Sequence, residues 1–260
     1  MKKYHSIFYT LLVILFSSCG NSWIPLSLDD TLGSNSAAQI NNGMPGMEVL
    51  DETDYPEAYE YLNNLKSKIL ASGKVKHGED FKWELKIIKD DSVLNAFCLP
   101  GGYIYVYTGL MKYLETEHAL AGVIGHEMAH ADLRHGTTQL VKNMGLSLAL
   151  QLIFGGDASQ LVNIGANLIA LSFSRSDEKD ADMKSVEYLY NTELDARGTG
   201  VFFKKIQKDG KNPEIVEFLS THPNPDNRVE EINNKWMELG GKKGLENRQK
   251  YQSMLKTLNY

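Results

Sequence analysis

The chain has 260 residues, of which 42% are apolar, 10% aromatic and 23% charged. This composition excludes collagen-like, low-complexity and wholly disordered chains, and the length suffices for one large domain or two small ones. Asp and Glu outnumber Lys and Arg by 33 to 27, a formal net charge of -6 that disfavours a nucleic-acid-binding protein, and the two cysteines are too few for a disulfide framework.

The first 18 residues are predicted to be a secretory signal peptide. Two lysines open the chain, and the apolar run that follows, residues 7–16, is too short to span a bilayer. Two serines then precede Cys19, and residues 15–19 resemble a bacterial lipobox, in which the cysteine is acylated and becomes the mature N-terminus. We therefore expect a lipid anchor at Cys19 that holds the protein to a membrane of the bacterial cell envelope, facing the periplasm. The alternative is an ordinary cleaved signal followed by an incidental cysteine.

Residues 19–53 are rich in Asn, Ser, Gly and Asp and show no helical or strand period, which predicts a flexible tether. Part of this segment can instead lie against the domain, and the sequence leaves both alternatives open. No internal repeat or long linker follows, so residues 54–238 are expected to form one domain. Residues 239–260 carry more Lys and Arg than Glu and are predicted to be a basic amphipathic tail, either solvated or in contact with anionic lipid.

The elements expected in the domain change from strands to helices along the chain. Apolar residues at helical spacing predict a helix over residues 55–71. Alternating patterns predict strands at 81–88, 94–99 and 103–107, with a turn at Pro100-Gly101-Gly102. Everything from residue 116 onward is expected to be helical, which favours an α+β fold that is mostly helical.

Two apolar segments, residues 140–154 and 161–173, are each shorter than a bilayer span. Gly155, Gly156 and Asp157 separate them, and both contain polar residues. We therefore expect a helical hairpin packed on the domain, and contact with lipid is the alternative.

His126-Glu127-Met128-Ala129-His130 is an HExxH motif within a helix predicted to begin after Thr116 and to end near Gly136. His126 and His130 are four residues apart, so both imidazoles lie on one helix face and can bind one zinc ion. Glu127 lies about 100° further round the helix and can reach a metal-bound water without being a ligand.

An HExxH string also arises by chance, and two glycines in the same helix argue against chance. Gly122 and Gly125 each cost about 1 kcal/mol of helix stability relative to alanine. This cost predicts that something approaches that surface of the helix closely.

A catalytic zinc needs a third protein ligand besides two histidines. A metzincin takes it from a histidine six residues after the second one, but that position is Gly136, so the metzincin pattern is excluded. A later predicted helix, capped by Ser174, offers Glu178 as the ligand and Asp182, one turn on, as the acceptor that orients a ligand histidine. The other interpretation is a solvated acidic helix start, which the helix dipole favours by itself.

Four separated motifs together resemble those of one family. They are Asn95-Ala96-Phe97 with Pro100-Gly101-Gly102, the HExxH motif preceded by Gly125, Ser174-Arg175 followed by Glu178 and Asp182, and Thr221-His222-Pro223 with Arg228. Over residues 55–235 the chain resembles the HtpX/BepA-like zinc metallopeptidases, gluzincins that include the CAAX prenyl endopeptidases. The resemblance implies a zincin-like metallopeptidase domain with a small β-sheet packed on the active-site helix. The transmembrane helices and helical repeats of larger members are not expected here, so the chain resembles the short LoiP-type lipoproteins.

The resemblance also implies roles for individual residues. One zinc ion per chain is expected, with Glu127 as the catalytic base and His126, His130 and Glu178 as the metal ligands. Asp182 is expected to orient a ligand histidine. His222 is expected on a loop facing the zinc, as an oxyanion donor or as a reversible fourth ligand, and Arg228 is expected to anchor that loop to a carboxylate.

Substrate backbone is expected to add as a strand to a sheet edge above the zinc. Asn95, Ala96 and Phe97 are the expected edge, and a buried strand is the alternative. Cys98 has no disulfide partner if Cys19 is acylated, so it is expected to be a buried apolar residue. The tyrosines at 103, 105 and 107 either line a pocket or pack in the core.

These predictions describe a zinc-dependent endopeptidase of the cell envelope whose substrates are polypeptides, misfolded envelope proteins in particular. A zinc ion held by these residues would supply a Lewis acid, and Glu127 is expected to take a proton from the water that attacks the scissile carbonyl. The alternative is an envelope chaperone or assembly factor that uses a closed or weakly active form of the same fold. A purely structural zinc site is disfavoured because such sites have four protein ligands and are rich in cysteine.

Overall fold

The computed structural model describes residues 24–145, 151, 158–210, 218–223 and 227–258. The predicted signal peptide and Cys19 lie outside these residues. The helices are α2 (Leu26–Asn41), α3 (Pro56–Leu70), α4 (Thr108–Tyr113), α5 (Glu117–Asp132), α6 (His135–Met144), α8 (Ala158–Ile169), α9 (Arg175–Tyr190), α10 (Gly198–Asp209), α12 (Arg228–Glu238) and α13 (Arg248–Leu255), and the strands are β1 (Glu84–Ile88), β2 (Ala96–Leu99) and β3 (Tyr103–Tyr107). Single 3-10 turns form at Pro100–Gly102 and Lys256–Leu258.

The three strands form one small sheet in the order β1-β3-β2. The central strand β3 runs parallel to β1 and antiparallel to β2, and the turn predicted at Pro100–Gly102 joins β2 to β3. The first strand begins at Glu84 instead of residue 81, because Trp83 has a φ of 46° and interrupts the extended backbone. Because β3 is central, β2 is an edge strand of the sheet within the described residues.

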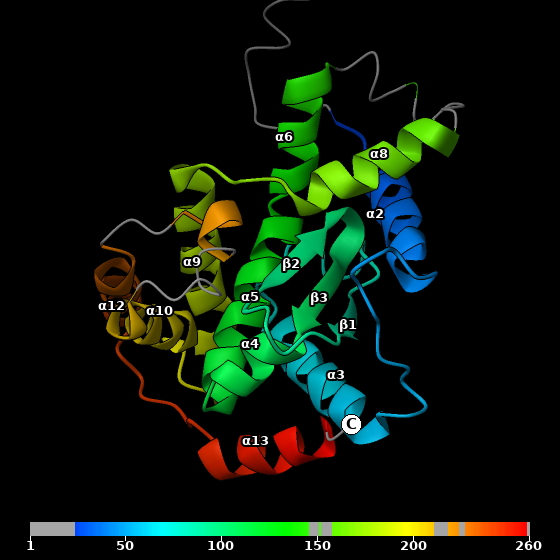
Figure 1. Cartoon of the computed structure of the whole chain (residues 1–260). Coiled ribbons are helices and arrows are strands. Elements are labelled where there is room, and N and C mark those ends of the chain that lie inside the picture. The colour runs from blue at the N-terminus through cyan, green and yellow to red at the C-terminus, as the bar shows by residue number, and fades with distance from the viewer. Residues whose placement is uncertain (1–23, 146–150, 152–157, 211–217, 224–226, 259–260) are drawn as a thin grey trace, which may run out of the picture.

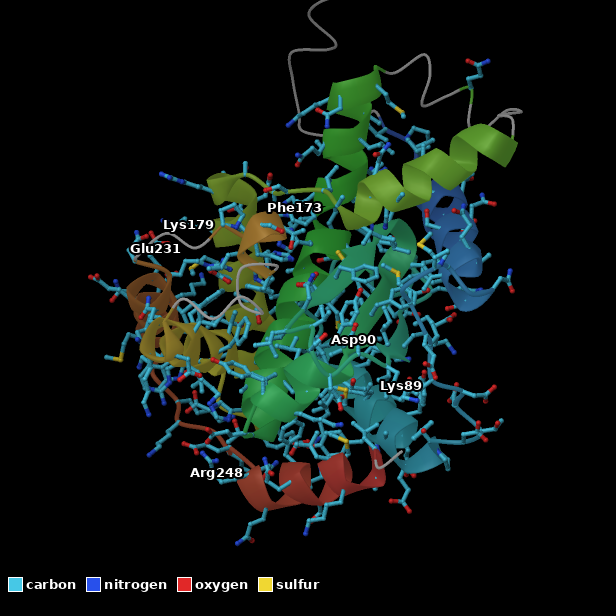
Figure 2. The ribbon with its side chains drawn as sticks, in the orientation of Figure 1. Lys89, Asp90, Phe173, Lys179, Glu231 and Arg248 are labelled. Carbon is cyan, nitrogen blue, oxygen red and sulfur yellow. The ribbon has the colours of Figure 1, made fainter. Side chains whose placement is uncertain are left out.

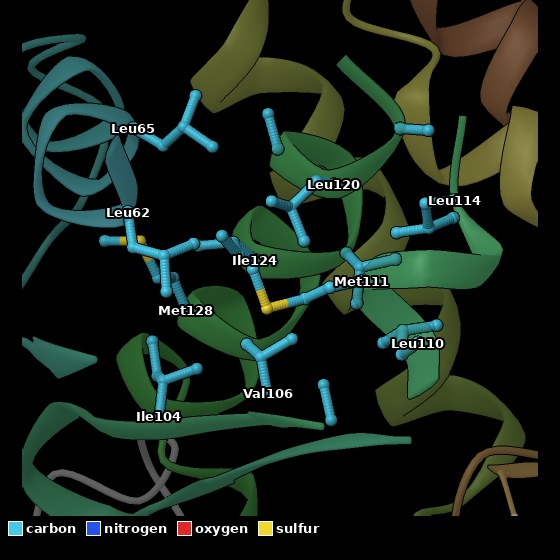
Figure 3. Packing of buried hydrophobic residues seen from close by; sticks show 14 of the residues in the cluster. Leu62, Leu65, Ile104, Val106, Leu110, Met111, Leu114, Leu120, Ile124 and Met128 are labelled. Carbon is cyan, nitrogen blue, oxygen red and sulfur yellow. The ribbon is translucent and has the colours of Figure 1, made fainter. Parts of the chain in front are cut away.

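Helix α5 crosses one face of this sheet, and α3 packs beside it (Figure 1). Figure 3 shows the core between them: Ile104 and Val106 of β3 face Leu62 of α3 and Ile124 of α5. All of these side chains are fully buried. The expected α+β fold, mostly helical with a small sheet packed on the motif-bearing helix, is confirmed.

Helix α2 covers the opposite face of the sheet, together with α6 and α8 (Figure 1). Its Leu28, Leu32 and Ile40 are at most 1% exposed. A Cβ placed on Gly33 would lie 1.9 Å from the carbonyl oxygen of Pro100, so only glycine allows this approach to the turn between β2 and β3. Of the two alternatives for residues 19–53, the described helix α2 lies against the domain and is not a flexible tether. Small and polar residues stand between the leucines, so the sequence shows no clear helical period here.

The two apolar segments form the helices α6 and α8, which pack on the same side of the sheet, but α8 lies against α2 and does not pair with α6 as the expected hairpin would (Figure 1). Leu140 and Val141 of α6 and Ile164 and Leu168 of α8 are buried in one cluster with α2. The residues that join the two helices, 146–150 and 152–157, lie outside the described part of the chain. Among the described residues, no helix has both the length and the apolar character that crossing a membrane requires.

The C-terminal segment forms the predicted helix, α13, but it is part of the domain and not a solvated tail. Tyr251 is fully buried, and its hydroxyl donates a hydrogen bond to the backbone oxygen of Met111 at 2.6 Å. Lys250 forms an ion pair with Glu117 at the start of α5. The basic residues that predicted a separate tail are thus in part the partners of acidic residues on the domain.

Candidate metal centre

Helix α5 is shaped by its glycines and by its neighbours. A Cβ on Gly122 would lie 2.1 Å from the backbone nitrogen of Thr199 in α10, and one on Gly125 would lie 2.9 Å from Oγ of Ser185 in α9. The close approach predicted from these glycines is present, and the groups that approach are two packed helices. Helices α9 and α10 therefore lie directly against the face of α5 that carries the motif.

The two ends of α5 differ in detail from the prediction. Thr116 occupies the N-cap position, but its side chain makes no capping hydrogen bond. The helix ends at Asp132, before the predicted Gly136, because Arg134 adopts a left-handed conformation with a φ of 60° and α6 starts at His135. This left-handed residue changes the direction of the chain between α5 and α6. It thereby places His135 next to the motif helix.

Helix α9 begins with the predicted cap at Ser174. Its hydroxyl accepts a hydrogen bond from the backbone N–H of Asp177, and the Asp177 carboxylate accepts one from the backbone of Ser174, which forms a capping box. The cap fixes the start of a helix that carries Glu178 and, one turn on, Asp182. Both carboxylates are at most 1% exposed and face α5.

Four side chains from three segments converge on one point, with potential ligand atoms of His126, His130, Glu178 and His222 all within 4.8 Å of one another. The Nε2 atoms of the two motif histidines are 3.0 Å apart. Oxygens of Glu178 lie 3.3 Å from Nε2 of His130 and 3.5 Å from Nε2 of His126. In a tetrahedral zinc site with bonds of about 2.0–2.1 Å, ligand atoms are about 3.3–3.4 Å apart. The donor types and their spacing therefore fit one zinc ion.

The charges of this cluster also fit a divalent cation. Glu127, Glu178 and Asp182 are buried carboxylates, and Arg228 is, among the described residues, the guanidinium that contacts two of them. Burial opposes the charged form of His126, yet hydrogen bonds to Asp182 and Glu178 raise its pKa to about 9. Without a metal, His126 is therefore expected to be the positively charged imidazolium at neutral pH. Burial lowers the pKa of His130 well below its ordinary value and keeps that imidazole neutral, as a ligand must be.

The ring nitrogen of His126 that faces away from the cluster contacts a carboxylate, and an arginine binds that carboxylate. Nδ1 of His126 lies 2.9 Å from Oδ1 of Asp182. Arg228 donates to both oxygens of Asp182, at 2.6 and 2.7 Å, and its third nitrogen lies 2.9 Å from Glu178. Arg228 also donates to the backbone oxygen of Pro223 at 3.4 Å, which ties the segment after His222 to the same carboxylates. The predicted neighbours are thus all present at this histidine.

The other motif histidine has a partner that sequence reasoning missed. Nδ1 of His130 lies 2.9 Å from Nδ1 of His135, the first residue of α6. If Nε2 of His130 binds a metal, its Nδ1 carries the proton and donates it to His135, whose own proton then sits on Nε2. Nε2 of His135 faces Asp177 at 3.8 Å. Its position five residues after His130 carried no signal, because a continuous helix would have pointed it elsewhere.

Two phenylalanines, also missed from the sequence, enclose the cluster. Phe173 stacks on the ring of His130 with centroids 4.0 Å apart; Figure 2 labels it next to the start of α9. Phe218 stacks on His222 with centroids 4.8 Å apart and an interplanar angle of 18°. The backbone N–H of Phe173 donates to the oxygen of Thr221 at 3.1 Å, which holds the two aromatic segments together. Phe218 precedes His222 by four residues, a spacing that hinted at this contact.

His222 lies over the cluster in a position that the sequence alone did not decide. Nδ1 of His222 is 3.0 Å from Oε1 of Glu178, and its Nε2 is 3.6 Å from Oε1 of Glu127. Neither oxygen of Glu127 accepts a hydrogen bond within the described part of the chain, although the side chain is fully buried. Burial raises the pKa of Glu127. Glu127 is thus a buried carboxylate beside the cluster of potential metal ligands, and its oxygens can accept a hydrogen bond from a bound water or substrate.

The residues expected to bind substrate belong to β2 and the residue before it, but the backbone groups that point away from β3 are not those of all three predicted residues. The backbone N–H of Tyr107 donates to the oxygen of Asn95, so Asn95 and Phe97 direct their backbone groups toward β3, while Ala96 and Cys98 direct theirs away from it. Phe97 also turns its ring away from α5 and stacks on Tyr105.

The outward N–H of Ala96 is bonded to the side-chain oxygen of Asn95 at 2.9 Å. Cys98 is half-buried next to Glu127, and burial together with Glu127 raises its pKa well above the ordinary thiol value. Cys98 packs against the apolar core and its thiol stays neutral, so the predicted apolar character is confirmed, but the side chain is only partly buried. The tyrosines of β3 pack among the apolar residues against α2.

The matching family agrees with this geometry. Residues 56–235 match the model of peptidase family M48. The chain belongs to this family. The expected resemblance to the HtpX/BepA-like metallopeptidases and the expected zinc metallopeptidase domain are thereby confirmed at the level of the family.

Several metalloendopeptidases of this kind are similar in sequence. The chain is 30% identical over 184 residues to mitochondrial metalloendopeptidase OMA1 of Schizosaccharomyces pombe, which covers 68% of this chain and 52% of that protein. It is 29% identical over 193 residues to metalloprotease LoiP of Escherichia coli, covering 69% and 72%. It is 27% identical over 225 residues to a putative beta-barrel assembly-enhancing protease of Vibrio cholerae, covering 78% and 43%. The matches to the OMA1 proteins of Arabidopsis thaliana, S. pombe and Bos taurus span only 32–52% of those relatives.

Proposed function

We propose that the chain is a zinc-dependent endopeptidase in which His126, His130 and Glu178 hold the metal. The observation that carries this proposal is the convergence of these three side chains from α5 and α9 on one buried point, with Glu127 beside it. Zinc bound there supplies a Lewis acid for the scissile carbonyl. Membership of a peptidase family supports the same chemistry.

Glu127 is proposed as the general base. Its oxygens accept no hydrogen bond from described residues, and burial raises its pKa, so it is suited to take a proton from the attacking water at Oε. The same oxygen then delivers the proton to the leaving amine. Both transfers take place out of contact with bulk solvent, because the carboxylate is fully buried.

His222 is proposed to close the resting site. Its imidazole contacts both Glu127 and Glu178, and every member of the cluster is at most 1% exposed. A substrate carbonyl needs the space that this ring fills, so the segment that holds His222 moves away before cleavage. His222 is also proposed to donate an N–H to the oxyanion that forms on the carbonyl oxygen once the substrate is bound.

Substrate is proposed to bind as an added strand along β2. The carbonyl oxygen of Ala96 and the N–H and carbonyl groups of Cys98 point away from β3, and the side chains of both residues face α5. Cys98 is partly exposed but Ala96 is fully buried, so the groups that cover Ala96 move aside when a peptide pairs with this edge. A peptide paired with this edge runs past Glu127, to which Cys98 is adjacent. Backbone pairing holds an extended chain without selecting its side chains, which suits unfolded polypeptides.

The cellular setting is proposed to be the bacterial envelope. LoiP of Escherichia coli is a metalloprotease, and the Vibrio cholerae relative is named for enhancing beta-barrel assembly. The signal peptide and lipobox-like sequence that end at Cys19 would deliver the chain to that compartment and anchor it by a lipid. The substrates are then misfolded envelope proteins exposed to the periplasm.

A Glu127→Gln variant tests the mechanism. Loss of the general base is expected to lower the rate of casein cleavage by about 10²–10⁴-fold, while zinc content stays near one per chain because Glu127 is not a ligand. Glu115→Gln is the matched control, since Glu115 is half-exposed and paired with Arg248 and Lys205 away from the cluster. Cleavage by Glu127→Gln at the wild-type rate would show that another group is the base.

The alternative, a chaperone or assembly factor with a closed site, is favoured by one observation, the complete burial of the cluster under His222. It predicts that Glu127→Gln suppresses aggregation of an unfolded envelope protein as well as the wild type does, and that neither protein cleaves it. Light scattering and gel analysis of the same mixture separate the two functions.

A further inference from the structure

The segment that follows Cys19 is fastened to the end of the metal-binding helix. Arg134, immediately after α5, donates from its guanidinium to the backbone oxygens of Ile24 and Pro25, at 2.8 and 3.1 Å. It also donates to the carboxylate of Asp29 at 3.0 Å, and that carboxylate accepts a further hydrogen bond from Thr137 of α6. Asp29 is fully buried and Arg134 is 8% exposed. These contacts fix the chain from Ile24 onward.

The attachment continues through α2 and is not limited to one arginine. Ile24, Leu28 and Leu32 are at most 2% exposed and pack with the sheet, α6 and α8. Burial of this apolar face stabilises the attachment, and the Arg134–Asp29 pair fixes its position, because breaking the pair would leave an uncompensated buried charge. The N-terminal segment therefore stays on the domain whenever the domain is folded.

Only residues 20–23 separate Cys19 from this fixed point. A fully extended chain spans at most about 3.3–3.6 Å per residue, so Ile24 lies within about 18 Å of the acylated residue. A free tether over residues 19–53 would have a root-mean-square span of about 30 Å and a far greater extended reach. The folded α2 removes most of that reach.

The metal cluster lies close to the same point. His130 precedes Arg134 by four residues, about 6 Å along a helix, and Arg134 contacts Ile24 directly. Adding the lengths of the side chains places the cluster within about 40 Å of Cys19. The acyl chain of a lipidated cysteine lies in the membrane, so the cluster is held at a bounded height above the bilayer.

We propose that α2 and Arg134 act as a strap that holds the active site next to the membrane surface, so that the substrates are polypeptide segments close to the bilayer and not chains deeper in the periplasm. This inference rests on the proposed peptidase activity and on acylation of Cys19. The partner surface is the bilayer to which the lipid belongs. The length of the segment between Cys19 and Ile24 sets the range of cleavage.

Two membrane-anchored reporters in phosphatidylethanolamine–phosphatidylglycerol vesicles test this range. Each carries an unfolded casein-derived segment above a proline-rich spacer of 8 or 25 residues, about 25 or 78 Å at 3.1 Å per residue. The acylated wild-type protein in the same vesicles is expected to cleave the short-spacer reporter at least tenfold faster. Insertion of 60 Gly and Ser residues between Asn21 and Ser22 is expected to reduce this ratio to less than threefold, because the domain then reaches farther.

The same insertion after Gly73 is the matched control. Gly73 follows α3 in a turn and has a φ of 68°, and a Cβ placed on it would meet no atom within 4 Å. The insertion there lengthens the chain without lengthening the strap. This control is expected to keep the tenfold preference.

Cleavage of soluble casein and the mass of the N-terminal peptide are measured on each preparation. A wild-type protein that is acylated, cleaves casein and yet cleaves both reporters equally overturns the strap and leaves the proposed function intact. Absence of an acyl group on Cys19 overturns the anchor and the strap together. Failure to cleave casein overturns the proposed peptidase activity itself.

Discussion

Both faces of the three-stranded sheet bury an apolar core, but the charged groups buried near these two cores differ. On the α5 side, carboxylates of Glu127, Glu178 and Asp182 lie around two histidines, with Arg228 among them. On the α2 side, leucines, isoleucines and aromatic rings fill the space around one buried ion pair, Asp29 with Arg134. The first side is arranged for metal chemistry, and the second holds the chain that follows Cys19, the proposed site of lipid attachment.

The two sides should differ in how a lost contact affects stability and in whether a bound metal ion can compensate for that loss. A buried carboxylate without its cation leaves an uncompensated charge, whereas a shortened leucine leaves a cavity. Zinc can restore charge balance on the α5 side but has no contact with the α2 side. Variants on the two faces should therefore respond differently to added metal.

Arg228→Met gives the largest expected effect. It leaves Asp182 and Glu178 buried without their guanidinium, so the free energy of unfolding of the metal-free protein is expected to fall by about 3–5 kcal/mol. Urea unfolding followed by tryptophan fluorescence measures the change. Lys179→Met is the control: Lys179 and Glu231 pair on the outside of α9 and α12 (Figure 2), and an exposed pair contributes less than about 1 kcal/mol. Equal stability of the two variants would contradict the proposed charge arrangement.

Leu32→Ala sharpens the comparison from the other face. The side chain is 1% exposed on α2, so its truncation is expected to cost about 2–5 kcal/mol of unfolding free energy while zinc affinity stays unchanged. Leu26→Ala, in the same helix but 37% exposed, should cost about 0.5 kcal/mol or less. The measurement is urea unfolding with and without zinc. If Leu32→Ala were as stable as Leu26→Ala, the N-terminal segment would be a free tether after all.

His135→Leu has the smallest expected effect on stability but a clear effect on metal binding. It removes the acceptor for Nδ1 of His130, so zinc affinity is expected to fall about 10–100-fold in competition with a chromophoric chelator. His135→Gln, which keeps an acceptor oxygen, should recover part of that loss. His118→Leu is the control, because His118 is also buried on α5 but lies two turns from the cluster. A His135→Leu protein with wild-type zinc affinity would show that His130 needs no such partner.

The sequence was informative where function requires fixed residue types at fixed spacing. The HExxH motif and the capped helix with Glu178 and Asp182 stand at positions that the structure brings together. The two glycines of α5 pointed correctly to a close approach, although not to the helices that make it. The strands and the α+β class followed from alternation and turn residues, with errors of a few residues at the ends.

The sequence was misleading where burial depends on a neighbour that no local pattern identifies. Helix α2 is rich in serine, asparagine and aspartate, and polar residues interrupt its apolar face. That face is buried because Gly33 allows the helix to approach the turn between β2 and β3. The basic C-terminal residues looked solvated, because their partners Glu115 and Glu117 are more than a hundred positions away in the chain.

What the sequence determined by itself is the set of groups able to bind and use a divalent cation, since a helix of known period fixes which side chains share a face. What only the tertiary structure decided is how those groups are supported and covered: the αL turn at Arg134 that returns His135 to His130, the placement of His222 over Glu127 and Glu178, and the docking of α2. These depend on contacts between distant segments, whose free energy comes from shape and burial and is not encoded in the spacing of residues along one element.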